Sequence, residues 1–226
     1  MTTIAANLQD VRERLGAACR AAGRSPDAVQ LLAVSKTFGP EAVAQAFAAG
    51  QRAFGENYIQ EAVEKIHALR HLGLEWHCIG PIQGNKTRLV AQNFDWVHTV
   101  DRLKTAQRLS DQRPASLTPL QVCIQVNIDG GANKSGVAPR EALALALQVA
   151  ALPRLRLRGL MCIPEPAANF ATAMAVHAQT RTLFDHLNTN GLSLDTLSLG
   201  MSADLEAAVS AGSTMVRVGT AIFGKR

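Results

Sequence analysis

Eight short apolar segments recur along this chain of 226 residues, and stretches with helical spacing separate them. Because parallel strands need a crossover between them, usually a helix, this alternation predicts an α/β fold. Eight such units predict a (β/α)8 barrel, with residues 1–226 as one domain. The expected strands are Val29–Ser35, Arg52–Phe54, Glu75–Ile79, Trp96–His98, Leu120–Val126, Leu155–Leu160, Thr196–Leu199 and Met215–Val218.

An open doubly wound sheet shares this local pattern and is the alternative architecture. No Gly-x-Gly-x-x-Gly turn follows the first expected strand, which disfavours the dinucleotide-binding version of that sheet. In a barrel, the functional face is built from the carboxyl ends of the strands and the loops after them. The residues that follow each expected strand are therefore the candidates for chemistry.

The formal net charge of +5 suits an anionic ligand or weak contact with nucleic acid. Aromatic residues make up only 4% of the chain and the basic residues are scattered, so we expect no nucleic-acid partner. The four cysteines contain no Cys-x-x-Cys pair, and no signal peptide or membrane-spanning apolar run is evident. We expect a cytoplasmic monomer with buried reduced thiols, no metal site and no contact with a membrane.

Lys36 ends the first apolar segment, so its amine is predicted to point into the functional face. A desolvated lysine loses its proton more readily, and the neutral amine condenses with aldehydes to form a Schiff base. The simpler alternative is that Lys36 marks the place where the strand reaches solvent.

Two loops at the expected ends of strands 7 and 8 favour a phosphate site, which recurs at this position in barrels. Ser202 is expected to cap a helix that begins near Ala203, where free backbone amides attract anions. Gly219 allows close approach of the backbone, and Thr220 adds a hydroxyl donor. Arg217 interrupts an apolar strand and is expected to face the barrel interior. There it would serve a pyridine nitrogen, or else form an internal ion pair with Glu56 or Asp204.

An aldehyde-binding lysine, a phosphate site and an arginine for a ring nitrogen together describe a pocket for pyridoxal 5'-phosphate (PLP). Five motifs that cover nearly the whole chain resemble the pyridoxal phosphate homeostasis protein family, which is related to the amino-terminal barrel of alanine racemase. These motifs are Ala33–Thr37, Phe54–Tyr58, Trp76–Lys86, Leu197–Asp204 and Arg217–Gly224.

The resemblance implies a barrel of the alanine racemase amino-terminal type that holds PLP as an internal aldimine on Lys36. It also implies that Ser202, Gly219 and Thr220 bind the phosphate, that Arg217 lies at the ring nitrogen, and that Asn57 and Met201 line the pocket. The implied function is intracellular PLP homeostasis without catalytic turnover, with PLP-dependent apoenzymes as transient partners.

A PLP-dependent amino-acid racemase is the main alternative function. A neutral ring nitrogen beside Arg217 weakens carbanion stabilisation, and racemisation needs a second base opposite Lys36. Barrel racemases take that base, a tyrosine, from a second domain that we do not expect here. Tyr58 is expected to be a packing residue with a hydrogen-bonded hydroxyl, and His77 a satisfied core histidine. A class I aldolase is a third alternative, but it leaves Arg217 unexplained.

Lys134 and the pair His67 and His71 each have a functional interpretation and a simpler structural one. Lys134 lies in the glycine-rich segment Asp129–Gly136, expected to be mobile, and could transiently take the aldehyde, although a solvated loop lysine is the simpler expectation. His67 and His71 have a spacing that suits a metal, but no third ligand is nearby, so an exposed helix face is expected.

Overall fold

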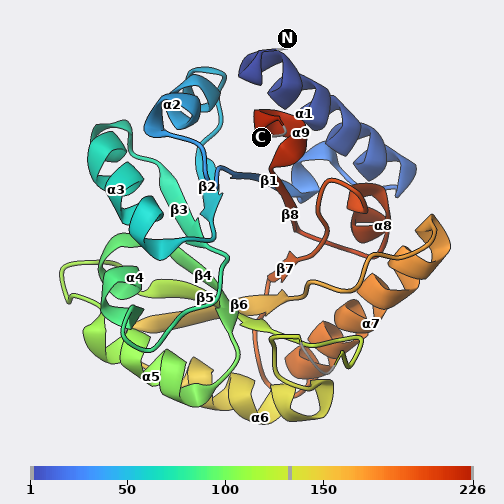
Figure 1. Ribbon diagram of the computed structural model, residues 1–226. Coiled ribbons are helices and arrows are strands. Elements are labelled where there is room, and N and C mark those ends of the chain that lie inside the picture. The colour runs from blue at the N-terminus through green and yellow to red at the C-terminus, as the bar shows by residue number, and fades with distance from the viewer. Residues whose placement is uncertain (1–2, 132–133, 225–226) are drawn as a thin grey trace.

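The computed structural model describes residues 3–131 and 134–224, and its eight parallel strands form a closed barrel (Figure 1). Each strand pairs with the next along the chain, and β8 pairs with β1. The predicted barrel is confirmed, and each expected strand is present with ends that shift by at most two residues. The strands are β1 (Gln30–Val34), β2 (Ala53–Glu56), β3 (Glu75–Cys78), β4 (Trp96–Val100), β5 (Leu120–Gln125), β6 (Leu155–Met161), β7 (Thr196–Ser198) and β8 (Met215–Val218).

Helices surround the barrel and cross from the end of one strand to the start of the next (Figure 1). They are α1 (Ile4–Ala21), α2 (Pro40–Ala48), α3 (Ile59–Leu69), α4 (Thr87–Asn93), α5 (Leu103–Gln112), α6 (Pro139–Ala150), α7 (Phe170–Thr189), α8 (Leu205–Ser210) and α9 (Thr220–Phe223), with 3-10 turns η1 (Pro26–Ala28) and η2 (Arg70–Leu72). None of the described helices has the length and apolar character needed to cross a membrane.

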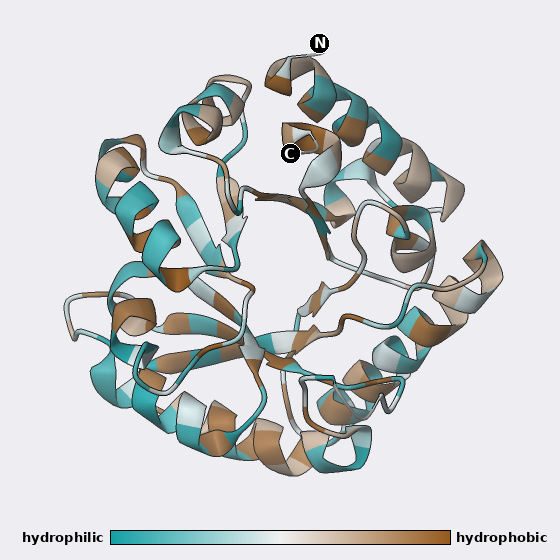
Figure 2. Cartoon of the chain, in the orientation of Figure 1, coloured by the Kyte–Doolittle hydropathy of each residue, from teal (hydrophilic) through white to brown (hydrophobic). Residues whose placement is uncertain are grey.

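The sequence sets the helix limits through local signals. The hydroxyl of Thr3 accepts a hydrogen bond from the Ala6 amide and so caps α1. The ring of Pro40 fixes the first turn of α2, where no amide donor is needed, and Gly50 follows the end of that helix with a positive φ. Along the outer helices, hydrophobic and hydrophilic residues alternate with the helical turn (Figure 2).

The main hydrophobic core fills the layer between the strands and the surrounding helices. On β8, Val216 and Val218 belong to this layer, whereas Arg217 between them points the other way, into the barrel. Pairing of β1 with β8 closes the barrel and brings Leu32 opposite Arg217. Small apolar clusters fill parts of the interior, such as the one formed by Trp96, Cys123 and Met161. The prediction that Arg217 faces inward is therefore confirmed.

Two further expectations concern the cysteines and the glycine-rich loop. All four cysteines are buried free thiols, as expected. In the loop between β5 and α6, Ala132 and Asn133 lie outside the described residues, so the expectation of a mobile segment stays untested there. The described part of the loop holds Lys134 beside two carboxylates.

Candidate functional site

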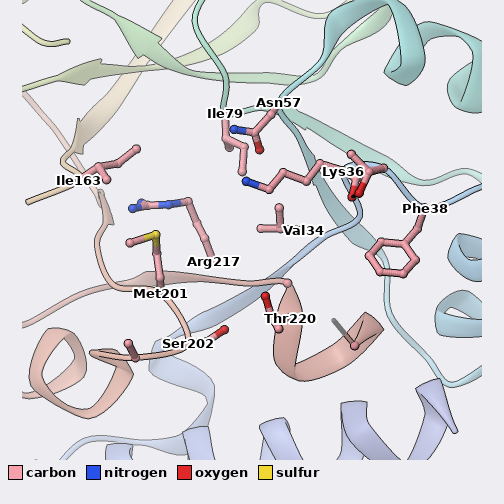
Figure 3. Close-up of a pocket in the computed structure, with 14 residues that line it drawn as sticks. Val34, Lys36, Phe38, Asn57, Ile79, Ile163, Met201, Ser202, Arg217 and Thr220 are labelled. Carbon is pink, nitrogen blue, oxygen red and sulfur yellow. Dashed lines mark hydrogen bonds between the residues drawn. The ribbon is translucent and has the colours of Figure 1, made fainter. Parts of the chain in front are cut away.

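A cavity of about 650 Å³ opens at the carboxyl ends of the strands, and its volume is typical of small-molecule sites. The seven residues predicted for a cofactor site all line it, although they come from four separate parts of the chain (Figure 3). These residues are Lys36, Asn57, Met201, Ser202, Arg217, Gly219 and Thr220. Apolar side chains form much of the remaining wall, and they are Val34, Phe38, Ile79 and Ile163.

Lys36 follows β1 and extends its amine between Asn57 and Val34 (Figure 3). The residue is exposed to solvent through the cavity mouth. The prediction that the Lys36 amine is desolvated is therefore wrong, because Lys36 lies beyond Val34, the last residue of the strand. Its amine is nevertheless free to meet a ligand inside the cavity, since no hydrogen bond or ion pair joins it to another described residue.

An ion cluster of the buried Glu56 and Lys65 and the partly exposed Glu61 lies beside the backbone next to Lys36, and it is called the buried ion cluster below. The Lys65 ammonium lies 2.8 Å from Glu56 Oε1 and 2.6 Å from Glu61 Oε1, and the Lys65 side chain is only 3% exposed. Burial raises the pKa of Glu56, although hydrogen bonds from Lys65 and Ser35 oppose this effect. Because Lys65 is the cation between both carboxylates, the cluster depends on it.

The buried ion cluster fixes the backbone on both sides of Lys36. The Lys65 ammonium donates to the Ser35 carbonyl at 2.8 Å, and the Ser35 hydroxyl donates to Glu56 at 2.7 Å. On the other side, the Thr37 amide donates to Glu61. Thr37 has φ = 70°, a conformation that β-branched residues rarely adopt and that the surrounding contacts must hold. The cluster therefore sets the direction in which Lys36 leaves the strand.

Arg217 is 4% exposed and occupies the wall opposite Lys36 (Figure 3). Its guanidinium donates to the carbonyl and hydroxyl oxygens of Ser198 and, at 2.9 Å, to the Cys162 carbonyl. Burial lowers the pKa of Arg217, but an arginine remains charged at neutral pH. The alternative interpretation, an internal ion pair of Arg217 with Glu56 or Asp204, is not found among the described residues. Three of the five N–H groups are engaged, which leaves donors for an acceptor in the cavity.

One wall of the cavity is formed by backbone, at the junction of β8 and α9. A side chain at Gly219 would place its Cβ 3.0 Å from the Val34 carbonyl oxygen, so this position suits glycine. Thr220 begins α9, and the amides of Thr220 and Ala221 have no hydrogen bond among the described residues, whereas those of Ile222 and Phe223 donate to the Gly219 carbonyl. The Thr220 hydroxyl has no hydrogen bond among the described residues. These groups offer an anion several donors.

Ser202 does not cap a helix, which corrects the prediction. Helix α8 begins at Leu205 and its N-cap is Asp204, because the intervening residues form a turn. Asp204 instead accepts the Met201 amide at 2.7 Å and pairs with His177 at 2.8 Å. Burial lowers the pKa of His177, but the hydrogen bond to Asp204 raises it and the result is about 9. A charged His177 therefore holds Asp204, and with it the loop that carries Ser202.

Asn57 enters the cavity from the loop after β2, beside Lys36 (Figure 3). Its side-chain oxygen is buried and has no hydrogen-bond partner among the described residues. Gly80, which follows β3, makes room for this loop, since a Cβ there would clash with the Asn57 carbonyl oxygen. A buried acceptor without a partner is expensive, so Asn57 favours a ligand that carries a donor.

The residues around the cavity fit PLP. The cofactor would need an amine at one side, donors for the ring nitrogen at another, apolar walls for the ring and an anion site for the phosphate. Lys36, Arg217, the apolar wall and the Gly219–Thr220 turn meet these needs in one cavity of suitable volume.

Comparison with known proteins gives the relationship of this chain. The family model for the amino-terminal domain of alanine racemase matches residues 2–226. A pyridoxal phosphate homeostasis protein from Pseudomonas aeruginosa is 59% identical over 100% of this chain and 97% of its own length, and one from Escherichia coli is 56% identical over 100% and 98%. The chain belongs to the pyridoxal phosphate homeostasis protein family. A solved structure of PipY from Synechococcus elongatus, described as having PLP bound, superimposes with a TM-score of 0.86 at 38% identity, covering 98% of this chain and 100% of that one.

In this member of the pyridoxal phosphate homeostasis protein family, the other candidate residues do not line the cavity, although the Lys134 ammonium donates to the carbonyl of the wall residue Ile163 at 3.2 Å. Tyr58 is 54% exposed, and its hydroxyl has no partner among the described residues, so the expected packing role is wrong. His77 is buried and bonded through both ring nitrogens, as expected. The Lys134 ammonium pairs with Asp129 and Glu165. His67 and His71 lie on an exposed face, as expected.

The sequence alone did not identify Lys65 or the apolar wall. Lys65 lies three residues after buried Ala62 and four before buried Leu69, a spacing that places it on the inner face of α3. A lysine at that spacing is a signal for a buried partner. Ile79 and Ile163 follow strands and look like ordinary core residues, so nothing in the sequence marks them as ligand contacts.

We expect Thr220→Val to weaken PLP binding by roughly tenfold, because the isosteric side chain cannot donate to the phosphate. Affinity for pyridoxal, which lacks the phosphate, should hardly change. Fluorescence titrations with both compounds measure the difference, and Thr182→Val on the exposed face of α7 is the matched control. Equal weakening for both compounds would exclude a phosphate role for Thr220.

Proposed function

We propose that this protein binds PLP reversibly for intracellular PLP homeostasis and does not turn over a substrate. The observation that carries the proposal is the convergence of Lys36, Arg217 and the Gly219–Thr220 turn on one cavity. The close relatives named pyridoxal phosphate homeostasis protein and the PipY structure with PLP bound support it.

Each wall of the cavity has a role in this proposal. When bound, PLP supplies an aldehyde that condenses with an amine, and Lys36 is the amine at the site. The Gly219–Thr220 turn and Ser202 bind the phosphate. Arg217 donates to the ring nitrogen, while Asn57 accepts from a donor on the cofactor and Met201 covers the ring.

The absence of turnover follows from the side chains around the site. Arg217 carries only donors, so a ring nitrogen beside it stays unprotonated and withdraws electrons weakly. Among the described residues that line the cavity, Lys36 and Arg217 are the only ionisable ones. Tyr58 is exposed outside the cavity and His77 is buried within a chain of hydrogen bonds. A racemase would need a second base there, and these residues supply none.

The location and partners complete the proposal. Four buried free thiols suit the reducing cytoplasm, and PLP-dependent apoenzymes are the transient recipients of the cofactor. Lys134 takes no part in the transfer. Burial lowers its pKa, but the hydrogen bonds that its ammonium donates to Asp129 and Glu165 raise it, and the net rise keeps its amine charged. The barrel acts as a single-domain monomer without nucleic-acid or membrane partners.

Exchange of the α-hydrogen of amino acids in heavy water separates a binding protein from a racemase. We expect the PLP-loaded protein to show no exchange above free PLP for alanine, serine or lysine in a proton NMR time course. The same loaded protein should restore activity to an apoenzyme that requires PLP. Exchange that depends on the protein and is lost in Lys36→Ala would contradict the proposal and favour the racemase.

A further inference from the structure

An unbroken chain of hydrogen bonds crosses the inside of the barrel and ends at Arg217. His77 Nε2 lies 2.8 Å from Glu75 Oε1, and His77 Nδ1 lies 2.9 Å from His98 Nε2. His98 Nδ1 lies 2.9 Å from Ser198 Oγ, which in turn lies 2.6 Å from Arg217 Nη1. Glu75, His77, His98 and Ser198 are called the relay below.

The relay joins the two ends of the barrel. Glu75 is the first residue of β3, and in a parallel barrel the first residues of strands lie at the mouth opposite the cavity. His98 on β4 and Ser198 on β7 reach each other across the interior between strands on different sides of the barrel (Figure 1). Both histidines and Ser198 are fully buried, while the Glu75 side chain is 41% exposed.

The carboxylate at one end sets the direction of each hydrogen bond. A hydrogen bond from His77 lowers the pKa of Glu75, so Glu75 is an ionised acceptor at neutral pH and His77 Nε2 donates to it. At the other end of the relay, His98 Nδ1 is the one acceptor that the described residues offer to the Ser198 hydroxyl, so His98 carries its proton on Nε2 and donates it to His77 Nδ1. Burial lowers the pKa of His98 well below its usual value, so His98 is neutral and its Nδ1 accepts from the Ser198 hydroxyl. The lone pairs of Ser198 remain for Arg217.

We propose that Glu75 is a remote positioning residue for the ligand group that Arg217 contacts, because it fixes the tautomers of the relay and thereby the guanidinium. The inference rests on the proposed function, in which that group is the ring nitrogen of PLP. Arg217 has no carboxylate partner among the described residues, so neutral acceptors set its orientation. Ser198 is the one side-chain acceptor among them, and the relay determines where its hydrogen points.

Without Glu75, the relay loses its direction. His77 can then move its proton to Nδ1, His98 must follow by moving its own proton from Nε2 to Nδ1, and Ser198 receives donors from both His98 and Arg217. The Ser198 hydrogen then has no acceptor in the relay, so the Arg217 contact weakens. Gln30 provides a matched control, because its amide donates to the same Glu75 Oε1 at 3.1 Å but lies outside the relay.

The first test uses the cofactor-free protein. Side-chain ¹⁵N NMR of labelled histidines should show His77 and His98 with the proton on Nε2 in the wild type and in Gln30→Ala. In Glu75→Ala, both rings should shift toward the Nδ1 form, while Glu75→Gln, which keeps an acceptor oxygen, should retain the wild-type tautomers. Unchanged tautomers in Glu75→Ala would overturn the inference.

The second test compares PLP with its 1-deaza analogue, which has carbon in place of the ring nitrogen. Glu75→Ala should bind PLP about threefold to tenfold more weakly than the wild type, but it should bind the analogue as tightly as the wild type does. Gln30→Ala should bind both ligands with wild-type affinity. Equal weakening for both ligands would make Glu75 a structural residue only. If wild-type protein binds neither ligand, the proposed function is wrong. The histidine tautomers of the cofactor-free protein still test whether Glu75 fixes the direction of the relay.

Discussion

Lys36→Ala protein that has been incubated with PLP and freed of excess cofactor is expected to lack the absorbance band of a lysine-bound cofactor and to bind PLP more than about tenfold more weakly. The reason is that the amine at the cavity mouth is lost, while the phosphate turn and Arg217 remain and still hold PLP without a covalent bond. Absorbance spectra and equilibrium dialysis measure the two effects separately.

Lys86→Ala is the matched control, because Lys86 also follows a strand on the same face of the barrel but lies outside the cavity. It should retain the wild-type spectrum and affinity. A Lys36→Ala variant that keeps the spectrum, or a Lys86→Ala variant that loses it, would assign the aldehyde to another amine.

Lys65→Met should lower the free energy of unfolding by about 3–5 kcal/mol, the usual cost of removing one partner from a buried ion pair. Methionine fills nearly the same volume, so the loss reports the charge of Lys65 rather than a cavity. Glu56 then stays buried without its cation, and the Ser35 carbonyl loses a donor. Denaturant titration measures the change, and Lys104→Met on the exposed face of α5 should change stability by less than about 0.5 kcal/mol.

The pH dependence of the stability lost in Lys65→Met, called the deficit below, provides a second check. Burial already raises the pKa of Glu56 above its unfolded value, and loss of Lys65 raises it further. A carboxyl group with a raised folded pKa favours folding below its unfolded pKa and opposes folding once the pH exceeds the folded pKa. The deficit of Lys65→Met should therefore be largest at neutral pH and shrink as the pH falls. A deficit that is the same at every pH would show that the charge of Glu56 is not its cause.

Periodicity was sufficient for the fold because short, largely buried strands alternate with amphipathic helices along the chain. The first apolar segment and the segment with Arg217 between two valines could both be predicted as strands without three-dimensional information. Since the carboxyl ends of parallel strands meet at one mouth, the site residues after those strands could also be predicted to converge.

Contacts that depend on exact turns could not be predicted in this way. The helix after β7 begins two residues later than its sequence suggests, because Asp204 uses its side chain for the Met201 amide and becomes the N-cap. Tyr58 lies one residue before α3 and so points outward. The relay joins residues 100 positions apart across the barrel, and no local pattern records that contact.

Mass spectrometry of the borohydride-treated wild-type protein tests the central claim most directly. After incubation with PLP, reduction and digestion, we predict a single major modified peptide, with the pyridoxyl phosphate mass on Lys36. The same mass on Lys134, Lys86 or the amino terminus instead, or no modified peptide at all, would contradict the account of this cavity.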